Sequence, residues 1–203
     1  MGLYVHALSR LPLELERDYY VYVLDYGWDE PLGQTLHMNF RRMADLAAKN
    51  KAVVIAGTDS RAFAEEILSV HVDDPDFSWS KVNGEDGEEV LPALMISTIH
   101  PKRFREEVPG YRFGKALKGS ADEKLILIPL RGLCKDSTEV VALIERIFRD
   151  IAAQKPLTDF AIAKEIKAGN GAAFSDAFIL KPALWGVGVD LKELVKTWRA
   201  KVA

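Results

Sequence analysis

A short apolar run at residues 94–99 constrains the fold of this chain more than any other feature of its sequence. The run is rich in β-branched residues, and the flanking Pro92 and Pro101 leave too little room for a helix. A continuous apolar run of this length is typical of a strand buried on both faces of a sheet. Pro92 lacks an N–H group and suits the first position of such a strand. We therefore expect a central strand over residues 93–99. A proline at this place could follow a cis peptide bond, and we expect the trans bond because it is the commoner isomer.

Other strand-like runs lie on both sides of this central strand. Residues 19–24, 51–56 and 124–130 are apolar runs of strand length, rich in β-branched side chains. Residues 2–8 suggest a short edge strand, and residues 11–16 suggest an extended segment. Several strands of this kind are enough for one sheet.

Helical patterns alternate with these strands. One continuous amphipathic helix is predicted over residues 31–50, because its apolar residues recur at steps of four, three and four. Asp59 or Ser60 can cap a second helix that follows the turn at residues 57–60. Asp136 and Glu139 have capping-box spacing and open a third helix with one apolar face. The first helix has its apolar stripe at Leu36, Phe40, Met43 and Ala47.

The chain is read as one α/β domain over residues 1–203, with a core at about 19–153 and a C-terminal extension at 154–203. Residues 72–89 are acidic and contain turn dipeptides, whereas residues 102–118 are basic and irregular. In the extension, the pattern predicts a helix near residues 158–167, a strand at 177–180 and a last helix that begins at Leu191.

The resulting order from residue 19 to 151 is β-α-β-α-β-β-α. With Leu91-Pro92 at the start of the central strand, this order resembles the thioredoxin-like superfamily. The resemblance implies a mixed sheet in which the central strand runs opposite to residues 19–24. Redox enzymes of that family carry Cys-x-x-Cys at the start of the first helix, but residues 28–31 here read Trp-Asp-Glu-Pro. The resemblance therefore implies a member without thiol–disulfide chemistry.

The alternative fold is a flavodoxin-like or Rossmann-like sheet in which all strands are parallel. It requires residues 102–120 to form a crossover, and their weak helical pattern favours the mixed sheet. The two folds place different residues beside the loop at Asp25. The mixed sheet brings the Pro92 end of the central strand there, and the parallel sheet brings the His100 end.

Composition excludes several classes of function. The formal net charge is −3, which does not favour nucleic acid as a partner. Cys134 is the only cysteine, so the chain cannot form an internal disulfide, and we expect a cytoplasmic protein. We also expect no membrane segment. Arg131 and Lys135 lie near Cys134 and would lower its pKa, but without a neighbouring base we expect a structural thiol. No metal or other cofactor is expected, because the histidines lack ligand spacing: His6, His37, His71 and His100.

One set of polar residues suits catalysis. In the parallel sheet Asp25, Asp59 and His100 could act as base, orienter and acid of a nucleotide-binding, hydrolytic or transferase enzyme. The alternative is that Asp59 caps a helix, Asp25 is a turn residue and His100 is a solvated strand end. We favour this alternative, because turns and caps explain these residues without further assumptions.

Aromatic residues in the expected loops point to binding instead. Tyr26, Trp28 and Trp79 lie in these loops, and loop aromatics are favoured anchors at protein interfaces. A small local core under the acidic segment would explain these aromatic residues equally well. Together with Pro92, these residues suggest a non-enzymatic binding or signalling module that contacts a protein partner or forms a homodimer.

Overall fold

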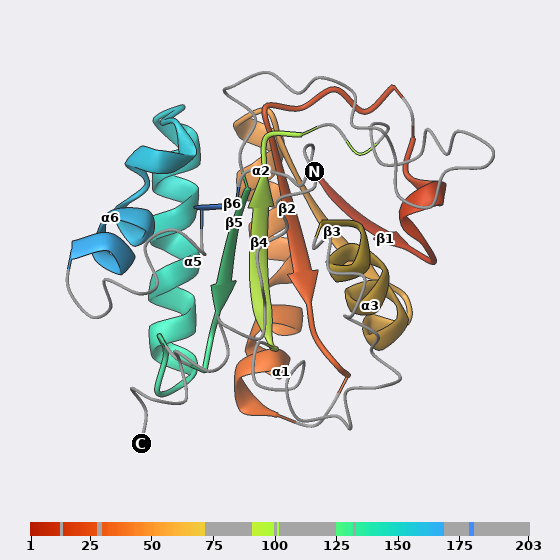
Figure 1. The fold of residues 1–203 in the computed structure, drawn as a ribbon, viewed down its shortest axis with the longest axis horizontal. Helices are drawn as coiled ribbons and strands as arrows, with labels where there is room; N and C mark the ends of the chain where they lie inside the picture. Colours follow the sequence, from red (N-terminus) through yellow and green to blue (C-terminus); the bar gives the residue numbers. More distant parts are fainter. Residues whose placement is uncertain are drawn as a thin grey trace.

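The computed structural model describes residues 1–12, 14–27, 30–71, 91–99, 101, 125–131, 133–168 and 179–180 (Figure 1). Its described strands form one mixed sheet in the order β1-β3-β2-β4-β5-β6. β1 and β2 each pair with β3 in parallel, whereas β4 is antiparallel to β2, and β5 is antiparallel to β4 and β6. The strands are β1 (Gly2–Val5), β2 (Tyr19–Leu24), β3 (Ala52–Gly57), β4 (Ala93–Ser97), β5 (Leu125–Pro129) and β6 (Ile179–Leu180).

The direction of β4 decides between the two sheets that the sequence allows. Leu24 at the end of β2 pairs with Ala93, and Tyr20 pairs with Ser97. The prediction of a mixed sheet is therefore confirmed, and the fully parallel alternative is wrong. Every residue of β4 is buried, as expected for a central strand. The Leu91–Pro92 peptide bond is cis, so the expectation of a trans bond is wrong.

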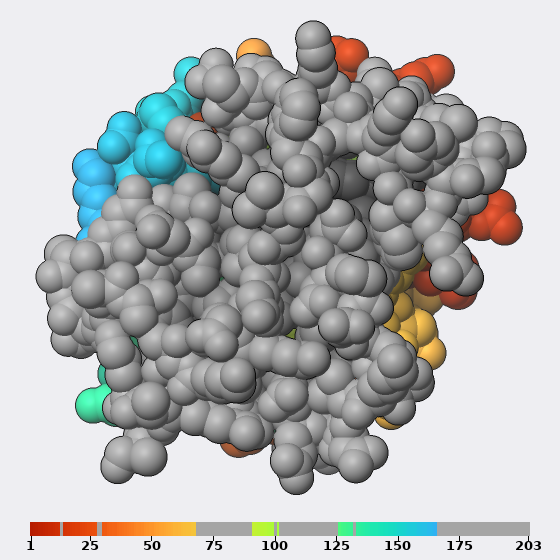
Figure 2. Space-filling model, viewed as in Figure 1, coloured from red at the N-terminus to blue at the C-terminus, as the bar shows by residue number. Residues whose placement is uncertain are grey.

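Helices cover both faces of the sheet. Side chains alternate between the faces of a strand, so Val21 and Val23 join one core cluster while Tyr20 and Tyr22 join the other. The first cluster includes residues of α1 (Pro31–Met38), α2 (Phe40–Lys49), α5 (Ser137–Ala152) and α6 (Ala161–Ala168). The second includes α3 (Ser60–His71). In the space-filling view, α3 and the pair α5–α6 lie on opposite flanks (Figure 2).

The helix predicted over residues 31–50 is divided at Asn39 into α1 and α2. The prediction of one continuous helix is wrong because polar side chains compete for its carbonyl groups. The Thr35 hydroxyl donates to the Pro31 carbonyl at 2.6 Å, and the Asn39 amide donates to the Thr35 carbonyl at 2.9 Å. Bonds of this kind bend helices. The predicted apolar stripe is confirmed, since all four members are buried: Leu36, Phe40, Met43 and Ala47.

Helix α5 begins as its sequence predicts. The Asp136 carboxylate accepts hydrogen bonds from the backbone N–H groups of Thr138 at 2.8 Å and Glu139 at 2.9 Å. The Glu139 carboxylate in turn accepts from the Lys135 N–H at 2.6 Å. These bonds satisfy N–H groups that have no partner within the helix.

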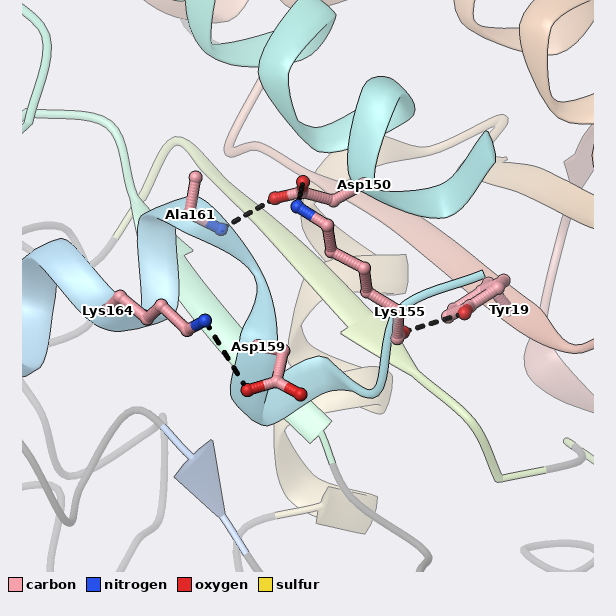
Figure 3. A network of polar contacts seen from close by, with 6 residues as sticks. All are labelled: Tyr19, Asp150, Lys155, Asp159, Ala161 and Lys164. Carbon is pink, nitrogen blue, oxygen red and sulfur yellow. Dashed lines mark hydrogen bonds and ion pairs between the residues drawn. The ribbon is translucent and has the colours of Figure 1, made fainter. Parts of the chain in front are cut away.

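A polar network at the other end of α5 attaches α6 (Figure 3). Asp150 is 3% exposed and accepts hydrogen bonds from the Lys155 ammonium and from the Ala161 backbone N–H, both at 2.6 Å. The Tyr19 hydroxyl, at the start of β2, donates to the Lys155 carbonyl at 2.8 Å. The network therefore links the C-terminal end of α5, the first residue of α6 and the sheet.

Three predictions outside the central strands need correction. The first strand ends at Val5 rather than at residue 8, and a 3-10 helix η1 (Leu8–Arg10) follows it. Residues 11–16 are not extended throughout, because the Leu15 N–H donates to the Pro12 carbonyl at 3.2 Å in a turn. The helix expected near residues 158–167 is a 3-10 helix, η3 (Leu157–Asp159), followed by α6.

Several predicted segments lie outside the described residues. They are the acidic segment at 72–89, the basic segment at 102–118 and the tail beyond residue 180. Of the strand predicted at 177–180, the structure describes β6.

Candidate functional site

The candidate site lies where β2 and β3 end and β4 begins. The pairing of Leu24 with Ala93 places Pro92 beside the segment that follows β2. The Leu130 N–H donates to the Pro92 carbonyl at 2.9 Å, so the residue after β5 also reaches this place. We call this region, formed by residues 25–27, 58–61, 91–92 and 130–131 and by α1, the β2 edge. Loops at the carboxyl ends of strands are the usual binding region of open α/β sheets.

A carboxylate–imidazole pair is the most chemically distinctive feature of the β2 edge. The Asp25 Oδ2 atom lies 3.1 Å from Nε2 of His37 in α1. The Asp25 side chain is 5% exposed and the His37 side chain 32% exposed. Within the described part of the chain, His37 is the only hydrogen-bond partner of this carboxylate. A buried carboxylate with a single partner depends strongly on that partner, because desolvation disfavours the charged form.

Gly33 allows the carboxylate to approach α1 closely. A Cβ atom at position 33 would lie 2.9 Å and 3.0 Å from the two Asp25 carboxylate oxygens. Gly33 is the third residue of α1, and the N–H groups of a helix's first turn carry partial positive charge. His37 lies one turn later on the same helical face. The absence of a side chain at Gly33 thus makes room for Asp25, while His37 supplies its hydrogen bond.

An ion pair spans from α1 to the end of β5. The Arg131 guanidinium donates from Nε to one Glu30 oxygen at 2.9 Å, and from its terminal nitrogen to the other oxygen at 2.7 Å. This two-bond geometry is the strongest form of an arginine–carboxylate pair. The charges of Glu30 and Arg131 therefore compensate each other at the β2 edge.

Tyr26 and Gly27 shape the loop after β2. The half-buried Tyr26 ring packs against the second core cluster, and the Arg61 guanidinium carbon lies 5.6 Å from its centre. This distance is within the range of a cation–π contact. Gly27 has a φ of +76°, which favours glycine because other residues rarely adopt it. The sequence predicts Tyr26 as a binding residue, and the structure places it at the β2 edge.

Asp59 caps α3. Its Oδ1 atom accepts a hydrogen bond from the Ala62 backbone N–H at 3.0 Å, which is the capping role that the sequence predicts. The neighbouring Thr58 hydroxyl lies 2.6 Å from Nδ1 of His6, a residue that follows β1. The structure therefore assigns Asp59 a local partner, and no described hydrogen bond joins it to Asp25.

Cys134 has the properties of a structural thiol. Burial, assisted by the nearby Glu139 and Asp136 carboxylates, raises the pKa of its thiol to about 11. The expectation that Arg131 and Lys135 would lower this pKa is wrong, because the thiol is only 5% exposed and desolvation dominates. The thiol stays protonated at neutral pH and is a poor nucleophile.

The remaining predicted site residues are not described. His100, Trp28 and Trp79 lie outside the described residues. The chain leaves β4 at Ser97, which pairs with Tyr20 at the start of β2. The parallel sheet on which the grouping with His100 depends is therefore not the sheet of this protein. The described residues contain no cluster of three or more metal-ligating side chains.

Sequence reasoning misses His37 and Gly33. The spacing between Asp25 and His37 follows no known ligand or catalytic pattern, because the loop between β2 and α1 sets it. Gly33 does carry a usable signal. An isolated glycine inside a helix costs roughly 1 kcal/mol relative to alanine and often marks a close approach.

Comparison with known proteins found no match to this chain among protein-family models, curated proteins or solved structures. Among the described helices, none is both long and apolar enough to cross a membrane.

Proposed function

We propose that this chain is a thioredoxin-like module that performs no dithiol chemistry and binds a protein partner, or a second copy of itself, through the β2 edge. The strand order supports the family assignment, since β4 begins after a proline and runs antiparallel to both β2 and β5. The single observation that carries the proposal is the register of β2 and β4. It gathers Tyr26, Pro92 and the Asp25–His37 pair at one edge of the sheet.

The chain has no cysteine suited to thiol–disulfide chemistry. Cys134 is the only cysteine of the chain, and its raised pKa of about 11 keeps it protonated. Position 31, at the start of α1, is a proline, and positions 28–30 hold no cysteine. A redox role would require a second thiol that this sequence does not contain.

The residues of the β2 edge suit the binding of a protein. It presents a tyrosine with an adjacent arginine, residue types that are enriched at interface anchors. Tyr26 rests on the core and Arg131 is held by Glu30, so both side chains are partly ordered before a partner arrives. Such preorganisation reduces the entropy cost of association.

The alternative is an enzyme that uses Asp25, Asp59 and His100. The antiparallel direction of β4 weighs against it, because the grouping depended on the His100 end of the strand lying beside Asp25. Asp59 is also engaged as a helix cap. We therefore favour the binding module.

Site-specific photo-cross-linking tests the proposal. A photoreactive phenylalanine analogue replaces Tyr26 at the β2 edge or, as a matched control, Arg149 near the C-terminal end of α5. We expect a discrete cross-linked product from position 26, either a homodimer or a complex with one partner protein, and none from position 149. Equal products from both positions, or no product from position 26, would contradict the proposal.

A further inference from the structure

Among the residues that the structure describes, the Asp25–His37 pair leaves one imidazole nitrogen without a hydrogen-bond partner. An ionised carboxylate only accepts hydrogen bonds, so Nε2 of His37 donates to Asp25 and Nδ1 keeps its lone pair. Nδ1 has no hydrogen-bond partner within the described part of the chain. With 32% of its side chain exposed, the ring is accessible from outside.

The buried carboxylate orients the second ring nitrogen as an acceptor. A carboxylate that holds one ring nitrogen of histidine fixes the tautomer and the orientation of the ring. Asp25 is well placed for this effect, because little water competes for its oxygens and Gly33 lets it lie against α1. The pair therefore presents an oriented hydrogen-bond acceptor.

The charges near His37 limit what this acceptor can bind. Glu30 is compensated by the two bonds from Arg131, whereas among the described residues the Asp25 carboxylate has only the imidazole as its partner. An anionic group would meet a lone pair backed by negative charge, which is repulsive. A neutral N–H or O–H group, or a lysine ammonium, is complementary.

We propose that Nδ1 of His37 is the acceptor through which the β2 edge recognises a protein segment that presents an uncharged or cationic hydrogen-bond donor. This inference rests on the proposed binding function and adds the chemistry of the partner. Asp25 and Gly33 act as positioning residues, since they fix the tautomer and the place of the pair.

His6 provides a matched comparison within the chain. Its Nδ1 atom lies 2.6 Å from the Thr58 hydroxyl, so the equivalent nitrogen is already engaged, and no carboxylate of a described residue holds the ring. A substitution at His6 removes an imidazole without removing a carboxylate-backed acceptor.

The first test needs no partner. Proton and ¹⁵N NMR of the full chain should show a slowly exchanging Nε2–H signal for His37, together with an Nδ1 shift typical of an unprotonated nitrogen. The signal should disappear in Asp25→Ala and persist in His6→Leu. A protonated Nδ1 in the neutral ring, or an Nε2–H signal that survives Asp25→Ala, would overturn the inference while leaving the proposed function intact.

The second test uses the cross-linker at position 26. We expect His37→Leu to reduce the cross-linked product about tenfold, the change that corresponds to one hydrogen bond to an interface acceptor, while His6→Leu leaves it unchanged. An unchanged product in His37→Leu would overturn the inference alone. Absence of product in the parent chain would overturn the proposed function and this inference together.

Discussion

Two aspartates of this protein are equally buried but differ in their partners. Asp150 and Asp25 are each 3% exposed. Asp150 accepts from an ammonium group and from a backbone N–H, and both donors lie within eleven residues of it in the sequence. Asp25 has one bond to the described part of the chain, from an imidazole that is itself partly exposed.

We propose that the difference separates a structural role from a binding role. The two strong donors of Asp150 lie where α5 meets α6, so its bonds hold helices together. The partner of Asp25 is a partly exposed imidazole at the β2 edge, whose second nitrogen has no hydrogen-bond partner among the described residues. On this proposal equal burial accompanies two roles, and the identity of the donor distinguishes them.

The largest effect is expected at Asp150. Asp150→Ala leaves the Ala161 N–H without its acceptor and breaks the pair with Lys155, so we expect a loss of about 2–3 kcal/mol of unfolding free energy. The Lys155 side chain is 42% exposed and can be hydrated again, which limits the loss.

Urea denaturation measures this loss of unfolding free energy. Asp150→Asn should lose less, since its amide oxygen can still accept; a stable Asp150→Ala would refute the structural role.

Cys134 is a third buried titratable group to set beside the two aspartates, and it remains neutral. Its folded pKa of about 11 lies above the ordinary thiol value, so the neutral thiol contributes stability that is complete below about pH 9 and is lost as pH rises toward 11. We expect this loss to reach up to about 2 kcal/mol.

The measurement is the difference in unfolding free energy between the parent chain and Cys134→Ala at pH 8 and pH 11. Taking this difference is necessary because burial also raises the pKa values of Tyr19 and Tyr20. A difference that does not change with pH would contradict the assignment of Cys134 as a buried neutral thiol.

A smaller effect is expected at Gly33. Alanine would normally favour a helix by about 1 kcal/mol, but here its methyl group would lie within 3.0 Å of both Asp25 oxygens. We expect Gly33→Ala to destabilise the protein by about 1 kcal/mol, since steric overlap exceeds the gain in propensity.

Asp25→Ala combined with Gly33→Ala supplies the control. Removal of the carboxylate removes the overlap, so alanine at position 33 should then be neutral or stabilising. Additive effects of the two substitutions would show that the close approach of Asp25 to α1 has no energetic importance.

The smallest effects are expected for ion pairs. Glu30→Gln breaks the two-bond pair with Arg131 and should cost about 0.5–1 kcal/mol. Glu145→Gln breaks the more exposed pair between Arg42 and Glu145, and should cost less than about 0.5 kcal/mol. Thermal unfolding of the two variants provides the comparison, and the reverse ranking would argue against a preorganised β2 edge.

Local patterns predict much of the fold. The β2 strand is found at its predicted residues, and the capping residues before α5 are correct, because both depend on neighbours in the sequence. The division at Asn39 is missed, since it depends on two side chains that bond to helix carbonyls. Apolar periodicity does not report such bonds.

The candidate site is less predictable. Asp25 is selected because it follows a buried strand, but its partner His37 is not, because tertiary packing rather than spacing joins them. The grouping with His100 fails with the parallel sheet, since reversing one strand exchanges which of its ends meets Asp25. The sequence thus favours the correct strand direction, whereas the contact between Asp25 and His37 depends on tertiary packing that no sequence pattern contains.

The most direct test of the account compares two isosteric substitutions, Asp25→Asn and Asp150→Asn, in the chain that carries the cross-linker at position 26. Unfolding free energy and cross-linked product are measured for both variants. We expect Asp25→Asn to reduce the product about threefold or more with little change in stability, and Asp150→Asn to lower stability with an unchanged product. Product yields that simply follow stability in both variants would contradict the division of the two aspartates into a binding and a structural role.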